Sequence, residues 1–191
     1  MKILVLDNYD SFTYNLVHYL EELTGEKVDV FRNDEISLDD VDRYDKIVLS
    51  PGPGVPVDAG ILEPLIARYA PTKSIFGVCL GLQAIGEVFG GTLVNLSQVY
   101  HGVATAISVT DTNDCTFANL PQTLEVGRYH SWVVDAATLP DELAVSAVDH
   151  NGQLMAFYHK TYDVRGVQFH PESILTPTGK QMLKNWLEKT E

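Results

Sequence analysis

Our prediction of the fold starts from residues 75–89, Ile75-Phe-Gly-Val-Cys-Leu-Gly-Leu-Gln-Ala-Ile-Gly-Glu-Val-Phe89. Residues 75–78 form a short apolar run, which is typical of a strand buried on both faces in a parallel sheet. Residues 80–89 are predicted to continue as a helix that ends at the glycines 90 and 91. A buried strand that leads straight into a helix is the unit from which α/β proteins are built.

The same alternation of strand and helix fills the residues before this stretch. Strands are predicted at residues 3–6, 28–31 and 47–49, and helices after Ser11, at 38–41 after Ser37, and near 61–69. Ser11 is predicted to cap the first helix and Gly25 to end it. Four strands alternating with helices within about 90 residues predict parallel βαβ units with right-handed crossovers.

After residue 91 the pattern changes to short strands separated by turns. These strands are predicted at residues 92–94, 104–109, 124–128, 143–148, 155–158 and 164–169, with a hairpin turn at Asn151-Gly152 and a final helix at 179–187. No repeat and no linker divides the chain. We therefore predict one α/β domain over residues 1–191. Its largely parallel central sheet is flanked by helices in a flavodoxin-like arrangement, and its second half adds antiparallel strands.

Composition and charge exclude several classes of function. The 191 residues carry 13 basic and 26 acidic side chains, a net charge of −13, so nucleic acid and anionic membrane surfaces are not expected partners. Two cysteines cannot form a disulfide framework, and no apolar run is long enough for a signal peptide or a membrane span. We expect a cytoplasmic protein.

The segment Gly77-Val-Cys-Leu-Gly81 has the spacing of a nucleophile elbow, with cysteine at its centre. At the start of a helix, the macrodipole favours the thiolate form of Cys79, and the Leu80 amide points toward an oxygen that develops negative charge. The alternative interpretation is that Cys79 is a small buried hydrophobic residue. No comparable setting surrounds Cys115.

A second segment, Gln168-Phe-His-Pro-Glu172, supplies a candidate base. Side chains two apart in an extended chain face the same side, so His170 and Glu172 are predicted to lie together, the carboxylate orienting the imidazole. A satisfied surface pair is the alternative. No metal site is predicted, because neither segment has a second His or Cys at ligand spacing.

The loop Ser50-Pro-Gly-Pro-Gly54 exposes bare backbone after a buried strand, so the Gly52 amide is a candidate anion donor. A rigid turn is the alternative, and the Lys of a phosphate-binding loop is missing. The polar and aromatic cluster 129–132 either lines a pocket or caps a strand.

Together these motifs, in this order, resemble the class I glutamine amidotransferase domain with its Cys-His-Glu triad. The opening Leu6-Asp-Asn-Tyr-Asp-Ser-Phe-Thr-Tyr-Asn15 also resembles the small subunits of anthranilate synthase and aminodeoxychorismate synthase. The resemblance implies that the catalytic residues are Cys79, His170 and Glu172, the oxyanion donors Gly52 and Leu80, and the substrate-binding residues Gly52, Gly54, Gln83, Ser131 and Trp132.

The resemblance further implies that L-glutamine is hydrolysed through a γ-glutamyl thioester and that ammonia passes to a chorismate-binding large subunit, component I of either synthase. This chain would need no cofactor, and Mg²⁺ is expected on the partner. Residues 9–14 and 100–102 are candidate interface, although core packing explains some of them equally well. Leu82 and Trp132 depart from common family residues, and we expect Leu82 to adjust substrate handling. Alternatives are a stand-alone cysteine γ-glutamyl hydrolase and a non-catalytic binding subunit.

Overall fold

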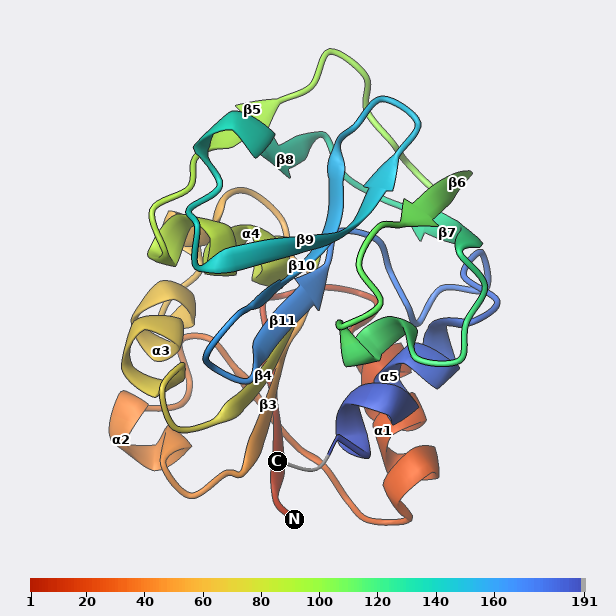
Figure 1. Ribbon diagram of the computed structural model, residues 1–191. Coiled ribbons are helices and arrows are strands. Elements are labelled where there is room, and N and C mark those ends of the chain that lie inside the picture. Colours follow the sequence, from red (N-terminus) through yellow and green to blue (C-terminus); the bar gives the residue numbers. More distant parts are fainter. Residues whose placement is uncertain (190–191) are drawn as a thin grey trace.

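The core of the structure is a central sheet whose two halves differ in strand direction. The computed structural model describes residues 1–189 (Figure 1), so the last two residues of the predicted domain lie outside the described range. The sheet order is β2-β1-β3-β4-β11-β10-β9-β6-β7. Strands β2 to β11 in this order are parallel, and each later neighbour pairs antiparallel. The largely parallel sheet with added antiparallel strands confirms the predicted fold class.

The element bounds follow the predicted ranges closely. The sheet strands are β1 Ile3–Asp7, β2 Asp29–Arg32, β3 Lys46–Leu49, β4 Ser74–Val78, β6 Val103–Val109, β7 Thr123–Arg128, β9 Leu143–Asp149, β10 Leu154–His159 and β11 Val164–Val167. The helices are α1 Thr13–Thr24, α2 Leu38–Val41, α3 Leu62–Tyr69, α4 Leu80–Val88 and α5 Gly179–Leu187, with 3-10 turns at Pro56–Asp58, Cys115–Phe117 and Ala136–Thr138.

Two helical layers cover the sheet, one on each face (Figure 1). Helices α1 and α5 cover one face, where Ile3 and Val5 of β1 point, and α2, α3 and α4 cover the face of Leu4 and Leu6. Trp186 of α5 is fully buried. Because β1, β3 and β4 are covered on both faces, they consist mostly of apolar residues, which made them recognisable from sequence.

Three details differ from the predictions. Ser11 does not cap α1: the helix begins at Thr13, and the Asp7 carboxylate accepts hydrogen bonds from the Thr13 hydroxyl and the Tyr9 amide, both at 2.9 Å. A short strand, β8 Trp132–Val134, was missed; it pairs with β5 Leu93–Asn95 in a separate two-stranded sheet. Strand β11 ends at Val167 rather than residue 169, and it pairs parallel with β4.

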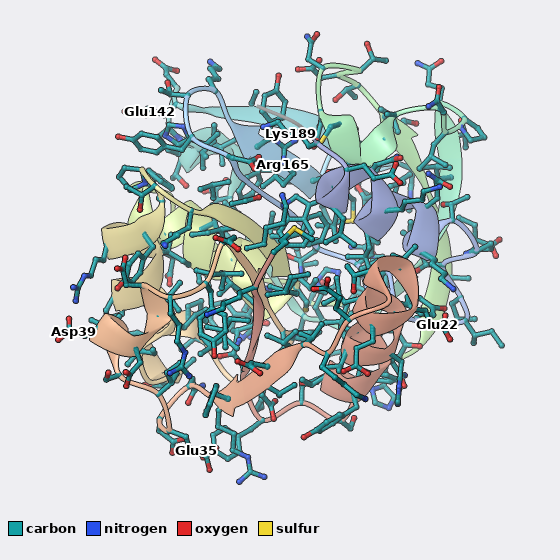
Figure 2. The ribbon with its side chains drawn as sticks, turned by 90° about the horizontal axis from the view of Figure 1, so that it is seen from below. Glu22, Glu35, Asp39, Glu142, Arg165 and Lys189 are labelled. Atoms are coloured by element: carbon teal, nitrogen blue, oxygen red, sulfur yellow. The ribbon has the colours of Figure 1, made fainter. Side chains whose placement is uncertain are left out.

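Many of the acidic side chains lie at the outer surface. Figure 2 shows Glu22, Glu35, Asp39 and Glu142 at the periphery, pointing outward, and all four are exposed. Within the part of the chain that the structure describes, no helix combines the length and apolar character that crossing a membrane would need.

Candidate active site

Cys79 lies at the junction of β4 and α4, in a backbone conformation that few residues adopt. Its φ of 53° and ψ of −100° place it in a strained region, which confirms the elbow predicted from the glycine spacing. Only 5% of the residue is exposed. Such a strained conformation persists only because the surrounding packing maintains it. The turn places Cys79 at the carboxyl end of β4 and at the start of α4.

The glycines on either side of Cys79 are required by close packing. A Cβ at Gly77 would lie 2.6 Å from the carbonyl carbon of Gly81, and a Cβ at Gly81 would lie 2.6 Å from the Leu49 carbonyl oxygen. Side chains at these positions would therefore push the helix away from β3 and β4. The glycines allow α4 to begin directly against the sheet edge.

His170 and Glu172 form a buried pair beyond the end of β11. The His170 Nδ1 atom and the Glu172 Oε1 atom are 2.6 Å apart, and the two residues are 2% and 4% exposed. The predicted pairing is thus present, but its predicted cause was wrong. Residues 171 and 172 form a turn rather than an extended strand, so the chain folds back and brings the carboxylate to the ring.

The other ring nitrogen of His170 is available to Cys79. Its Nε2 atom is buried and has no hydrogen-bond partner within residues 1–189. Burial lowers the pKa of His170, but the interactions with the Cys79 side chain and the Glu172 carboxylate outweigh burial and raise it to about 10. This imidazole therefore favours holding a proton, which is the property that a base paired with a thiol needs.

We expect the Cys79→Ala substitution to lower the pKa of His170, because the Cys79 side chain is the strongest of the influences that raise it. A pKa above the unfolded value near 6.5 means that protonated His170 stabilises the fold fully below that pH, and the contribution is lost as pH rises through about 10. An NMR titration of the imidazole in both proteins measures the shift. An unchanged titration curve would contradict the contact between the two side chains.

The loop at residues 50–54 is held by a buried asparagine, Asn8, for which the sequence predicts no such role. Asn8, just after β1, donates from its side-chain Nδ2 to the Ser50 carbonyl and from its backbone N–H to the Ser50 hydroxyl, both at 2.8 Å. A Cβ at Gly52 would lie 2.5 Å from the Asn8 carbonyl oxygen and 2.9 Å from the Leu80 side chain. Gly52 is therefore packed tightly between the β1 loop and the first turn of α4.

One cavity of about 260 Å³ gathers the predicted substrate-binding residues around Cys79. Its lining residues are Gly52, Pro53, Gly54, Cys79, Gln83, Tyr129, His130, Ser131 and Trp132. All five predicted substrate-binding residues are in this set. The polar and aromatic cluster 129–132 thus lines a pocket, which was one of its two predicted alternatives.

Hydrogen bonds inside the protein order the wall of this cavity. The Trp132 carbonyl accepts from Gln83 Nε2 at 2.9 Å and from His130 Nδ1 at 3.0 Å. Arg128 Nε donates to His130 Nε2 at 3.1 Å, which leaves Nδ1 as the protonated nitrogen. Burial and the Arg128 charge lower the pKa of His130 to about 4, so this ring is neutral beside the cavity.

Gln168 is a further residue that touches the nucleophile and was not assigned a role from sequence. Its Nε2 atom lies 3.4 Å from the Cys79 sulfur. The signal was present, since Gln168 opens the motif that contains His170. The motif alone, however, does not show that the Gln168 side chain contacts Cys79, which is 89 residues away in the chain.

Other predicted residues lie away from the cavity. Leu82 is fully buried in the core, where its side chain packs beside Gly166. It does not line the cavity, so no contact supports the expectation that it adjusts substrate handling. Tyr100, in the candidate interface segment 100–102, is only 3% exposed, and the Arg128 guanidinium lies 3.6 Å from its ring centre. Core packing therefore explains Tyr100. Cys115 does not line the cavity.

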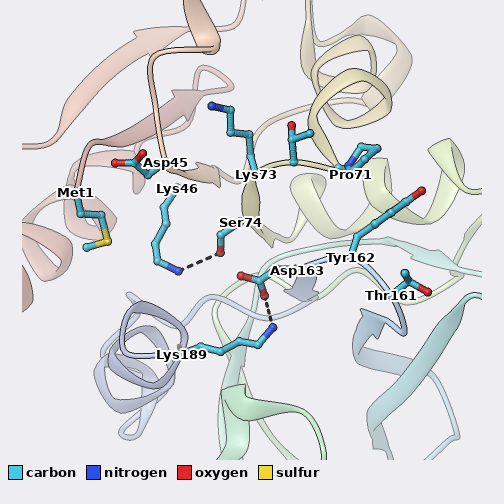
Figure 3. A pocket seen from close by; sticks show the side chains of 12 residues that line it. Met1, Asp45, Lys46, Pro71, Lys73, Ser74, Thr161, Tyr162, Asp163 and Lys189 are labelled. Atoms are coloured by element: carbon cyan, nitrogen blue, oxygen red, sulfur yellow. Dashed lines mark hydrogen bonds and ion pairs between the residues drawn. The ribbon is translucent and has the colours of Figure 1, made fainter. Parts of the chain in front are cut away.

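A larger hollow of about 620 Å³ lies at the opposite, amino end of the parallel strands. Figure 3 shows Lys46 bonded to Ser74, at the start of β4, and Lys189 paired with Asp163. Neither Cys nor His is among its lining residues, so it holds no thiol–imidazole pair like that of Cys79 and His170. Within residues 1–189, no three His, Cys, Asp or Glu side chains converge as a metal site would require.

Comparison with known proteins agrees with this geometry. Residues 4–190 match the family described as Glutamine amidotransferase class-I. Anthranilate synthase component 2 of Thermus thermophilus is 47% identical over 98% of this chain and 92% of its own length. Aminodeoxychorismate/anthranilate synthase component 2 of Bacillus subtilis is 46% identical over 97% and 95%.

Two further matches define how far the likeness extends. The Bifunctional protein TrpGD of Thermotoga maritima is 42% identical, but this chain spans only 32% of its length. A solved glutamine amidotransferase from Thermotoga maritima superposes with a TM-score of 0.81 over 98% of this chain and 96% of that chain, at 16% identity, and shares the fold. The full-length match and the relatives together establish that this chain belongs to the class I glutamine amidotransferase family.

Proposed function

We propose that this chain hydrolyses L-glutamine to glutamate and ammonia and that Cys79, His170 and Glu172 carry out the reaction. The observation that carries the proposal is the strained cysteine that lines a cavity and interacts with a buried imidazole–carboxylate pair. Family membership supports the same chemistry.

In the proposed first half-reaction, the Cys79 thiolate attacks the side-chain amide carbon of glutamine. The carbonyl oxygen becomes an oxyanion, and we propose that the amides of Gly52 and Leu80 donate to it. The tetrahedral adduct then collapses, the carbon–nitrogen bond breaks, and protonated His170 gives its proton to the leaving nitrogen. Ammonia departs and a γ-glutamyl thioester remains on Cys79.

In the second half-reaction, neutral His170 accepts a proton from water, and the resulting hydroxide attacks the thioester. The carbon–sulfur bond breaks, the thiolate reforms and glutamate is released. His170 is again protonated and Glu172 holds its ring in place, so the site is ready for another substrate. Among the cavity residues, Gly54, Gln83, Ser131 and Trp132 are proposed to hold the substrate backbone.

We expect Gly52→Ala to reduce glutamine turnover by roughly 10²–10³-fold, the cost of losing one oxyanion donor. The added methyl group would lie 2.5 Å from the Asn8 carbonyl oxygen, so the loop has to move and carry its amide away. Steady-state kinetics measure the loss. Gly152→Ala is a control outside the site, because a Cβ there meets nothing within 4 Å, although its positive φ makes it mildly strained. Equal turnover by Gly52→Ala and the wild type would rule out the proposed donor.

The direct test of the activity uses glutamine labelled with ¹⁵N in its side-chain amide. The wild-type chain should release labelled ammonia, whereas Cys79→Ala should release none. Labelled ammonia from Cys79→Ala at the wild-type rate would end the proposal. Labelling of Cys79 by a glutamine-like diazo-ketone would exclude a purely structural, non-catalytic subunit.

We further propose that the ammonia is delivered to a larger subunit that uses chorismate, because relatives at 46–47% identity are named as second components of anthranilate or aminodeoxychorismate synthase. Mg²⁺ would be bound by that partner. Tyr9, Tyr14 and Ile174 are 48%, 59% and 93% exposed, and such large apolar side chains suit an interface.

Two measurements distinguish between the two possible partner subunits, and between a subunit with a partner and a stand-alone hydrolase. The chain is assayed with the large subunit of each synthase, and the product, anthranilate or aminodeoxychorismate, identifies the pathway. Anthranilate is the product that we expect. Glutamine hydrolysis by the chain alone should be low and should rise when the partner and chorismate are present. Full activity without a partner, with no co-purifying subunit, would instead favour a stand-alone γ-glutamyl hydrolase.

A further inference from the structure

Gln168 lies beside Cys79 because of the register between two parallel strands. Val167 of β11 is paired with Val78 of β4, so the next residue along each strand is also adjacent. The backbone beyond β11 is held on both sides: the Cys79 amide donates to the Val167 carbonyl at 2.8 Å, and the Gln168 amide donates to the Met155 carbonyl at 2.8 Å. The position of Gln168 relative to the elbow is therefore determined by the sheet.

The side chain of Gln168 is fully buried and its amide is used at both ends. Its Nε2 atom donates to the Cys79 sulfur at 3.4 Å, and its Oε1 atom accepts from Gln83 Nε2 at 3.2 Å. The reversed amide would place one donor against another at Gln83 and an oxygen against the sulfur. The hydrogen-bond network therefore assigns the donor end to the sulfur.

We propose that Gln168 is a positioning residue for the nucleophile: it donates a hydrogen bond that favours the thiolate of Cys79, and it connects that sulfur to Gln83 in the wall of the cavity. The inference rests on the proposed function, which uses that thiolate. A buried hydrogen bond to an ion is stronger than one between neutral groups, so this donor stabilises the thiolate more than the thiol.

Several titratable side chains surround Cys79, either in contact with it or through His170. His170 is its charged neighbour, and Glu172 and Asp10 act on His170. His130 also lines the cavity, and its ring is neutral because burial and Arg128 lower its pKa to about 4. Gln168 differs from all of these because its carboxamide does not titrate. Its contribution therefore stays constant across the pH range in which His170 titrates.

The test measures the pH dependence of Cys79 alkylation by iodoacetamide, in a Cys115→Ser background so that one thiol reacts. Gln168→Met removes the donor and keeps the length of the side chain. Gln168→Glu keeps an acceptor for Gln83 but places a carboxylate oxygen against the sulfur. We expect the midpoint pH of alkylation to rise by about one unit in Gln168→Met and further in Gln168→Glu.

Glutamine hydrolysis is measured in the same proteins. We expect kcat to fall at least about tenfold at neutral pH while KM changes little, since the thiolate population is reduced. Gln181→Glu is the matched control, because this exposed residue on α5 carries the same change of charge far from the cavity, and its alkylation midpoint should equal that of the wild type.

A purely structural role would give a different result. Lower thermal stability with an unmoved alkylation midpoint in Gln168→Met would overturn the proposal, and this variant suffices if Gln168→Glu does not fold. The proposed function fails separately. If the midpoint moves as expected but the wild type does not hydrolyse glutamine, the hold of Gln168 on the sulfur is supported and only the proposed reaction is rejected.

Discussion

Cys79→Ser is expected to reduce glutamine hydrolysis by a factor on the order of 10⁵ or more, the scale seen when an enzyme loses its nucleophile. Serine is nearly the size of cysteine, so the elbow and the cavity should remain intact. Its hydroxyl, however, is not ionised near neutral pH and needs a strong base to become nucleophilic. The Cys79 side chain is also the strongest of the influences that raise the pKa of His170 to about 10, so the serine variant loses the partner that keeps the imidazole protonated. The site is therefore suited to a thiolate nucleophile and does not activate an alcohol.

The measurement is single-turnover release of ammonia, which detects even a slow acylation step. Cys115→Ser is the matched control: it makes the same change at the other cysteine, which does not line the cavity, and should keep wild-type activity. Cys79→Ser with more than about one hundredth of wild-type turnover would contradict a mechanism built on a thiolate.

Glu172→Gln is expected to reduce turnover by about 10⁴-fold, through the tautomer of His170. The carboxylate accepts a hydrogen bond from Nδ1 at 2.6 Å, so the ring presents an unprotonated Nε2 to Cys79 when it is neutral. A glutamine side chain can turn its amide group and donate to Nδ1 instead. The proton then moves to Nε2, where the ring can no longer take one from Cys79 or from water.

Glu172→Asp is the informative comparison, because it keeps the charge and changes only the reach of the carboxylate; we expect it to lose less activity than Glu172→Gln. Glu188→Gln, at an exposed position just after α5, controls for the loss of one negative charge. Kinetics of all three, with the imidazole tautomer read by ¹⁵N NMR, decide the point. A Glu172→Gln protein with near-normal turnover would show that His170 needs no carboxylate partner.

The parts of the site that were predictable depend on local geometry. The spacing of Gly77, Cys79 and Gly81 requires a sharp strand-to-helix turn, because only small residues fit against Leu49 and against each other. The strained φ of 53° at Cys79 follows from that turn. Apolar runs such as those of β1 and β4 predict strands equally well, because a parallel strand buried on both faces is apolar at nearly every position.

The errors arose where a distant group competes with a local one. Ser11 is a good capping residue, but α1 begins only at Thr13, and the Asp7 carboxylate at the end of β1 accepts from the Tyr9 amide and the Thr13 hydroxyl. Strand β8 is three residues long and is stabilised by pairing with β5, almost forty residues earlier in the chain. The turn at residues 171–172 likewise replaced the extended segment that was expected.

Most elements of the fold, the elbow at Cys79 and the proximity of His170 to Glu172 could therefore be read from the chain alone, because periodicity, glycine spacing and short motifs act over a few residues. The contact of Asn8 with the loop at Ser50 and that of Gln168 with the Cys79 sulfur become visible only in the folded chain. These contacts join residues 42 and 89 positions apart. They depend on which strands become neighbours in the sheet and in what register, and pairing between strands leaves no local pattern in the chain.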